Sequence, residues 1–161
     1  MRLIEKVMKY LLKKSNLAII PSTVSVEYKF TNPYSKFTQT YNTDACWDLY
    51  STEDIIIQPK STIMIPSGVI IQVPDGYEGE IKARSSFGIR GLMVHHGAID
   101  AGFQGELNPI IINLTDTEVE IKKGDRVCSF CLRRKIDINW VQVDDFSKSL
   151  RGTNYLGSSG R

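Results

Sequence analysis

The sequence is poor in the features that would assign a protein to a special class. Its 161 residues contain only 3 cysteines, too few and too unevenly spaced for a disulfide framework. No apolar run approaches the roughly 20 residues that span a bilayer, and nothing resembles a secretory signal. The 20 basic and 18 acidic residues leave a net charge of only +2, which provides no broad field for nucleic acid. We therefore expect a soluble, one-domain, intracellular protein without direct nucleic-acid binding, cytoplasmic or nuclear; a viral origin stays open.

The cysteines allow two interpretations. Cys128 and Cys131 form a C-x-x-C pair, and His95 and His96 could complete a zinc-binding set. The segment around the pair has the composition of a strand, however, and positions three apart on a strand point to opposite faces. We therefore expect Cys46, Cys128 and Cys131 to be reduced core residues in a reducing compartment.

Residues 1–20 differ from the rest and form an amphipathic helical extension in this prediction. Apolar residues recur there at helical spacing, and basic residues fall on the other side: Leu3, Ile4, Val7, Met8, Leu11 and Leu12 against Arg2, Lys6, Lys9 and Lys13. The helix could pack on its own domain or on a neighbouring subunit, or it could contact a membrane surface. We favour packing, because any surface helix has this pattern, but membrane contact stays open.

A period of two replaces the helical period after Pro21. Apolar and polar residues alternate over residues 24–30, and short β-branched runs follow at 54–57, 62–65, 69–73, 92–94, 110–112, 119–121 and 127–132. Turns rich in glycine and proline separate them. This pattern predicts an all-β domain over residues 21–145, a sandwich, jelly roll or barrel without a second long helix. Residues 146–161 form a tail that we expect to stay mobile until a ligand binds.

Polar or glycine-rich stretches interrupt this β pattern at residues 45–51, 83–86, 97–106, 123–127 and 151–160. Together they hold arginines, hydroxyls and backbone amides freed by glycine, which are the groups that bind phosphate oxygens. Asp48 and Asp100 could hold a divalent cation and activate water. No Walker A sequence is present. The pattern therefore indicates an anion site that is not a P-loop.

These stretches, in this order, resemble the five motifs of the trimeric dUTPase family, and the resemblance runs from about residue 22 to the end. It implies a jelly-roll-like dUTPase β-barrel that assembles as a homotrimer, with each active site drawing residues from all three subunits. It also implies magnesium-dependent hydrolysis of dUTP to dUMP and pyrophosphate. That reaction limits uracil incorporation into DNA and supplies dUMP for thymidylate synthesis.

The resemblance also implies roles for individual residues. Asp48 would hold magnesium through a bound water, as suits a cation that keeps much of its hydration shell. Asp100 would orient the water that attacks the α-phosphorus. Arg84, Ser85 and Ser86 match the phosphate-binding turn of the second motif.

The third motif would recognise the nucleoside. Main-chain groups of a hairpin with Gly97, Ala98 and Ile99 would bind uracil, and Asn108 would lie on the return strand. Phe103 stands where the family usually has a tyrosine under the deoxyribose, and its ring would still exclude a 2′-hydroxyl by bulk.

The last two motifs would supply a structural arginine and a lid. Arg126 matches the arginine of the fourth motif, as a structural partner rather than a direct ligand. Arg151 would pair with the γ-phosphate, and backbone amides around Gly157 and Ser158 would hold phosphate oxygens. Leu156 stands where the family's phenylalanine stacks on uracil. Such a lid excludes water when it closes.

Several positions depart from the family pattern: Cys46 replaces a glycine, Ser129 a glutamine, and residues 154–156 the usual Gly-Gly-Phe. His95 and His96 stand where small residues are usual; they could rim the uracil pocket, but we favour solvated turn residues. These changes bear on affinity and on lid dynamics more than on the chemistry.

Alternative functions fit parts of the sequence. A dCTP deaminase shares the fold but needs a glutamate as general base where this chain has Ile110, which cannot move a proton. A non-catalytic nucleotide-binding or regulatory module is the main alternative, although such a module would not need Asp100. A jelly-roll interaction protein would leave the polar stretches unexplained.

Overall fold

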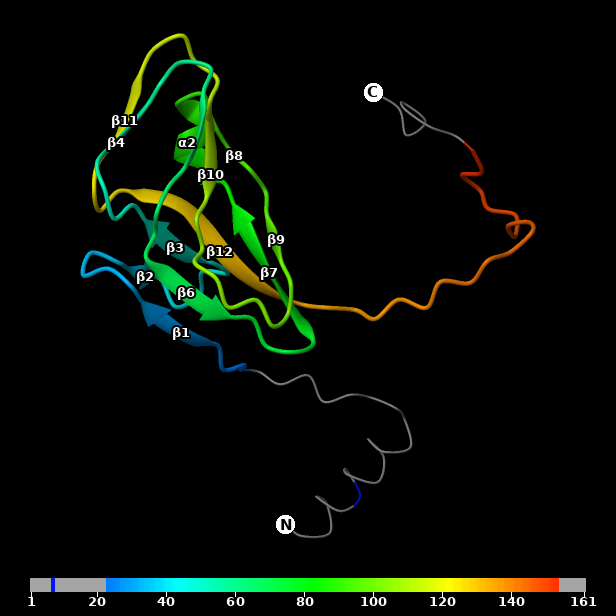
Figure 1. Ribbon diagram of the computed structural model, residues 1–161. Coiled ribbons are helices and arrows are strands. Elements are labelled where there is room, and N and C mark those ends of the chain that lie inside the picture. Colours follow the sequence, from blue (N-terminus) through cyan, green and yellow to red (C-terminus); the bar gives the residue numbers. More distant parts are fainter. Residues whose placement is uncertain (1–6, 8–22, 154–161) are drawn as a thin grey trace.

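The computed structural model describes residues 7 and 23–153, and within them the body is built almost entirely of strands (Figure 1). Apart from the helical residue Val7, the helix in the described part is the short α2 (Ser85–Ile89). The strands are β1 (Glu27–Phe30), β2 (Phe37–Thr38), β3 (Trp47–Tyr50), β4 (Ile55–Ile57), β5 (Thr62–Met64), β6 (Val69–Gln72), β7 (Tyr77–Lys82), β8 (Leu92–Val94), β9 (Ala98–Ile99), β10 (Ile110–Asn113), β11 (Val119–Ile121) and β12 (Arg126–Arg134).

The strands pair antiparallel in four small sheets. The largest has the order β2-β3-β12-β7-β9, and the others are β5-β10-β8, β1-β6 and β11-β4. The long strand β12 is central, because it pairs with β3 on one side and with β7 on the other. Its register with β3 shifts between Arg126 and Cys128, an irregularity of the β-bulge type that re-aims the side chains beyond it.

The core follows from alternation along these strands. On β7, Gly79 and Ile81 are buried, while Glu78 and Lys82 on the other face are more exposed. Gly79 is required by packing, because a Cβ atom there would lie 2.5 Å from the ring of buried Phe130. Buried isoleucine, valine and leucine side chains from the four sheets meet in the same apolar core. The five-stranded sheet thus buries one face and leaves the other for polar side chains.

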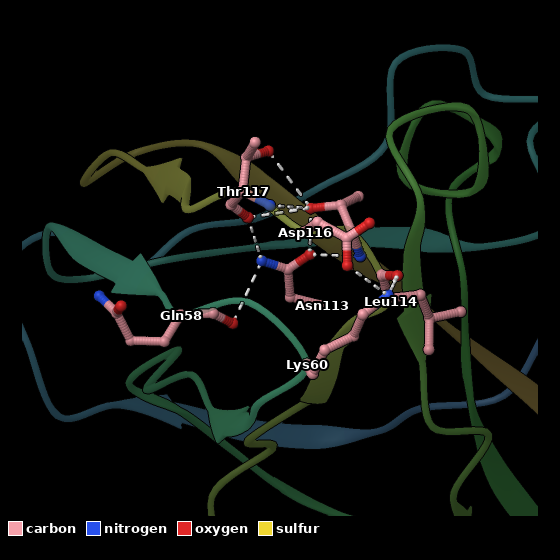
Figure 2. A network of polar contacts seen from close by, with 7 residues as sticks. Gln58, Lys60, Asn113, Leu114, Asp116 and Thr117 are labelled. Carbon is pink, nitrogen blue, oxygen red and sulfur yellow. Dashed lines mark hydrogen bonds and ion pairs between the residues drawn. The ribbon is translucent and has the colours of Figure 1, made fainter.

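Asn113 at the end of β10 organises the turn that follows (Figure 2). Its side chain is fully buried, and its amide nitrogen donates hydrogen bonds to the carbonyl oxygens of Ile57, Gln58 and Thr117 at 3.0, 3.2 and 2.8 Å. Its amide oxygen accepts from the backbone N–H and the hydroxyl of Thr115 at 2.9 and 2.7 Å. The buried amide is therefore fully hydrogen-bonded and acts as a structural tie.

The strands predicted from β-branched runs are present, with bounds that differ by up to three residues. The residue pattern does not predict β2, β3, β7, β9 or α2. Within the predicted N-terminal helix only Val7 is described, and it is helical and about half exposed; the remaining residues up to 22 lie outside the described part. No helix in the described residues is long and apolar enough to cross a membrane.

The chain leaves the body after β12, and residues 136–153 run outside it (Figure 1). Every residue from 133 to 153 is exposed. The exposed side chains include large apolar ones, at Ile136, Ile138, Trp140, Val141, Val143 and Phe146. An exposed apolar arm of this kind is unusual on a monomer and is typical of a segment that packs on another molecule.

Candidate active site

Asp48 lies in a pocket of about 450 Å³, called here the Asp48 pocket. It is bordered by β3, by β12 and by the loop before β3. Its lining residues are Thr40, Tyr41, Asp44, Ala45, Cys46, Asp48, Arg84, Arg126 and Ser129.

The Asp48 carboxylate is held by three groups from distant parts of the chain. Ser129 lies opposite Asp48 in the β3–β12 ladder, and its hydroxyl donates a 2.9 Å hydrogen bond to Asp48 Oδ1. The guanidinium of Arg84, which follows β7, donates to the same oxygen. Arg126 at the start of β12 lies 3.4 Å from Oδ2. The carboxylate is only 13% exposed, so these contacts fix its direction.

The donor groups of this pocket suit magnesium. Asp44, Asp48 and the hydroxyl of Thr40 are hard oxygen donors. Across residues 7 and 23–153, no group of three or more His, Cys, Asp or Glu side chains is arranged to hold a metal ion. A cation that keeps several waters and takes further ligands from a substrate's phosphates needs no such cage. The residues present therefore fit magnesium held through water.

A second pocket, of about 280 Å³, contains Asp100 and is called here the Asp100 pocket. It lies where β8 and β9 approach the start of β10. Its lining residues are Ile81, His95, Gly97, Ala98, Ile99, Asp100, Phe103, Glu106, Leu107, Asn108, Pro109 and Ile110. The third-motif residues that were predicted to bind the nucleoside and to orient the attacking water therefore line one pocket.

A tight turn directly after β9 places Asp100. The backbone N–H of Phe103 donates to the Asp100 carbonyl at 3.2 Å, and that of Gly102 donates to Val73 at 2.9 Å. Gly102 has φ +80°, a left-handed conformation that favours glycine. The Phe103 ring lies against Gly105, where a Cβ atom would come within 2.4 Å of the ring. The ring position is therefore set by the missing side chain of Gly105.

The return strand of this hairpin is tied to the turn before β6. Glu106 Oε1 accepts a 2.7 Å hydrogen bond from the backbone N–H of Gly68, and Asn108 Oδ1 accepts one of 3.3 Å from that of Ser67. The side-chain oxygen of Asn108 thus has an intramolecular partner, although Asn108 still lines the pocket. These hydrogen bonds attach the return strand of the hairpin to the turn before β6.

The two histidines have different surroundings. His95 is exposed and lines the Asp100 pocket, so both alternatives considered from the sequence stay open for it. His96 points elsewhere, and its Nε2 lies 2.8 Å from Glu80 Oε1. Arg133 Nε and Lys82 Nζ lie 2.8 and 3.1 Å from the other Glu80 oxygen.

These contacts change the acidity of Glu80. Burial acts to raise the pKa of its carboxyl group, but the hydrogen bond from Lys82 and the charges of Arg133, Lys82 and His96 act against it. The net result is a pKa below the ordinary value of 4.5. The ionised Glu80 side chain on β7 therefore connects this strand to Arg133 of β12 and to His96, which precedes β9.

The structure corrects the prediction for two of the cysteines. Cys46 and Cys131 form a disulfide between residues 85 apart in the sequence, rather than being reduced core residues. Cys128 is a buried free cysteine, as predicted. Burial, and next the negative charge of Asp48, raise the pKa of the Cys128 thiol to about 12. With Cys131 in a disulfide, the zinc alternative loses a ligand.

The remaining predicted residues are placed as follows. Arg84 ends the loop before α2, and Ser85 and Ser86 form the exposed first turn of this helix. Arg151 is exposed on the arm that leaves the body. The lid residues Leu156, Gly157 and Ser158 lie outside the described residues.

Some site residues were missed from the sequence. Thr40, Tyr41 and Asp44 line the Asp48 pocket, yet they come from a loop with no motif of its own. Asp44 is the one with a detectable signal, because a carboxylate four residues before Asp48 is a second oxygen donor.

Comparison with known proteins agrees with this geometry. Residues 32–160 match the sequence profile of the dUTPase family. The deoxyuridine 5'-triphosphate nucleotidohydrolase of Orientia tsutsugamushi (strain Boryong) is 33% identical over 138 residues, which cover 83% of this chain and 93% of the relative. That of Tropheryma whipplei (strain Twist) is 34% identical over 143 residues, covering 86% and 97%.

Solved structures are similar as well. The dUTPase of Staphylococcus bacteriophage 80alpha, solved with dUPNHPP, superposes with a TM-score of 0.80 at 25% identity, over 86% of this chain and 100% of that one. A mutant dUTPase from phage phi11 of S. aureus, with a structural Mg(II) ion, has a TM-score of 0.72 at 20% identity and supports the fold alone.

The fold and the two pockets define a nucleotide-hydrolysing β-barrel of the jelly-roll type. The chain belongs to the dUTPase family. This confirms the predicted fold and the predicted class of enzyme, a dUTP diphosphatase.

Proposed function

We propose that this chain hydrolyses dUTP to dUMP and pyrophosphate with Asp100 as the residue that activates water. The carboxylate of Asp100 shares a pocket with Phe103 and with the backbone of Ala98 and Ile99, and this one observation carries the proposal. A water next to Asp100 loses its proton to the carboxylate and attacks the α-phosphorus. The bond from that phosphorus to its bridging oxygen breaks, and pyrophosphate leaves.

The Asp100 pocket would also select the base and the sugar. Backbone groups around Ala98 and Ile99 have fixed directions because β9 pairs with β7 at Gly79 and Glu80. A base with the wrong donors would leave buried polar groups unpaired, which is how such a site rejects cytosine. The ring of Phe103, in place of the family's tyrosine, excludes a 2′-hydroxyl by bulk.

The Asp48 pocket supplies the groups for the triphosphate. Arg84 provides positive charge, with Ser85 and Ser86 beside it, and Arg126 supports Asp48 as a structural partner. Asp48 would hold magnesium through water, and the bound ion would neutralise charge on the triphosphate and make pyrophosphate a better leaving group. Arg151, with the amides around Gly157 and Ser158, would close over the phosphates, and Leu156 would cover the uracil.

The active site is completed by neighbouring copies in a homotrimer. The Asp48 and Asp100 pockets have no lining residue in common. β3 and β9 are separated by β12 and β7, which puts these two strands about 14 Å apart across the sheet. Asp48 is level with Lys82 of β7, whereas Asp100 follows Ile99, which pairs with Gly79, so the two aspartates are also offset along the strands. A water and the phosphorus it attacks must lie within a few ångströms. The two halves therefore meet only between subunits.

Two exposed apolar surfaces provide contacts for this assembly. One is the arm with Ile136, Ile138 and Trp140. The other is the outward face of the β5-β10-β8 sheet, where exposed Met64 and Met93 flank β10. Burying both surfaces against copies of the same chain would remove their apolar area from water.

The two alternative functions, a dCTP deaminase and a non-catalytic module, are distinguished by different observations. Ile110 lines the Asp100 pocket, so the position of the deaminase's general base is apolar. A non-catalytic nucleotide-binding module would bind dUTP without releasing pyrophosphate, which makes it directly testable. An intracellular location, cytoplasmic or nuclear, stays a prediction.

Subunit complementation tests the shared site. Asp100→Asn and Arg84→Ala are each expected to be inactive, but to restore activity when the two variants are co-expressed in mixed trimers. Random assortment gives each interface both intact halves about one time in four. A mixture with no more activity than either variant, although mixed trimers form, would contradict the shared site.

A further inference from the structure

Cys46 and Cys131 face each other across the β3–β12 ladder. The ladder pairs Ser129 with Asp48 and Phe130 with Trp47, so the next rung pairs Cys131 with Cys46. Their Cα atoms are 4.5 Å apart, the separation of a non-hydrogen-bonded antiparallel pair, and their sulfur atoms are bonded. The bond needs no movement of the backbone, because the strand pairing itself brings the two side chains together.

The pair also lies beside the phosphate-binding groups. Cys46 lines the Asp48 pocket and is half-buried, while Cys131 is 5% exposed behind it. On each strand only one residue separates the cysteine from a member of the pocket, Asp48 on β3 and Ser129 on β12. A reagent that enters the pocket reaches Cys46 first.

We propose that Cys46 and Cys131 form a thiol–disulfide site that is oxidised by low-molecular-weight disulfides and that tightens the Asp48 pocket around polyphosphate anions. The Cys46 sulfur gives up its proton, attacks the small disulfide and releases one small thiol. The Cys131 sulfur then displaces the second small thiol and closes the protein disulfide. Two electrons and two protons leave the protein, and one small disulfide becomes two small thiols.

The link to the pocket is the loop that precedes Cys46. This loop supplies Thr40, Tyr41 and Asp44, all exposed. Its turn is held by hydrogen bonds of 2.9 and 3.0 Å between Tyr41 and Asp44, and β2 before it has only two residues. The disulfide fastens the end of this loop to β12. When the Cys46–Cys131 disulfide is reduced, exposed hydrogen bonds are what hold the loop in place. The loop, which forms one wall of the Asp48 pocket, then fluctuates more.

The chemistry is tested by counting thiols in the full chain. The protein is treated with oxidised glutathione or with dithiothreitol, denatured, alkylated and weighed. We expect one alkylated thiol, that of Cys128, in the oxidised wild type and three in the reduced form, with a peptide that links Cys46 to Cys131. Cys128→Ala is the matched control and should still form the link. Three alkylated thiols after oxidised glutathione, or a link through Cys128, would overturn the site.

The effect on the pocket is tested with inorganic tripolyphosphate, whose binding involves no hydrolysis. Oxidation should raise the midpoint of thermal unfolding by about 10 °C and tighten tripolyphosphate binding about threefold by calorimetry. Both differences should vanish in Cys46→Ser and persist in Cys128→Ala. Equal affinity in the two redox forms would overturn the control of the pocket.

This second part rests on the phosphate-binding role proposed above. If neither redox form bound tripolyphosphate, that role would fail together with the control. The thiol count does not depend on it and would still decide whether the site exists.

Discussion

Ser129 on β12 lies directly opposite Asp48 on β3, and its hydroxyl donates a 2.9 Å hydrogen bond to the Asp48 carboxylate. In this chain the short side chain at position 129 hydrogen-bonds to the carboxylate across the ladder. Ser129 therefore helps to orient the Asp48 carboxylate.

Ser129→Ala removes a hydrogen bond to a carboxylate that is largely shielded from water. We expect it to cost about 1 kcal/mol of unfolding free energy and to raise the KM for dUTP about fivefold. Urea unfolding and steady-state pyrophosphate release measure the two effects. Ser61→Ala is the control, because that hydroxyl makes a 2.7 Å hydrogen bond outside both pockets. An unchanged KM would show that Ser129 does not orient Asp48.

Gly105→Ala should weaken discrimination between deoxyribose and ribose. The new Cβ would lie 2.4 Å from the Phe103 ring, which is already 40% exposed and can swing outward. We expect the ratio of kcat/KM for dUTP over UTP to fall about tenfold. Gly88→Ala provides the control, since nothing lies within 4 Å of the added methyl group. Unchanged selectivity in Gly105→Ala would show that the Phe103 ring does not exclude the 2′-hydroxyl.

Glu80 should make stability depend on pH in the acidic range. Its folded-state pKa lies below 4.5, so its contribution is fully present above pH 4.5 and is lost as the pH falls through the folded-state pKa. The midpoint of thermal unfolding of the wild type should therefore exceed that of Glu80→Gln near neutral pH, and the two should converge at low pH. Glu78→Gln, at an exposed position of the same strand, is the matched control for removing a carboxylate from β7. If the difference in unfolding midpoint between the wild type and Glu80→Gln stayed constant with pH, the Glu80 carboxylate would not be the source of the pH dependence.

The sequence predicted the family and the strands with β-branched runs, because both signals are local. It did not predict β3 and β7, whose apolar alternation is interrupted by polar residues such as Asp48, which lines a pocket, and Glu80, which forms ion pairs. Other features depend on strand register, which no local pattern encodes. The pairing of Asp48 with Ser129 and the bond between Cys46 and Cys131 both follow from one ladder with a shifted register near Arg126.

The sequence predicts the site as separate motifs, and these assignments stay predictions. The third-motif residues lie in one pocket, but they meet Arg84 and Asp48 only if another subunit brings them together. Sequence motifs list the members of such a site without saying which chain supplies each one.

The role of Asp100 in dUTP hydrolysis is tested most directly by comparing pyrophosphate release from the wild type and from Asp100→Asn. With magnesium present, the wild type should release pyrophosphate from dUTP and not from dCTP, dTTP or UTP, and no ammonia should appear from dCTP. Asp100→Asn should keep binding the analogue dUpNHpp while its kcat falls by a factor of about 100 or more. If the wild type binds dUpNHpp but releases no pyrophosphate from dUTP, or if Asp100→Asn retains full activity, the proposed role of Asp100 is wrong.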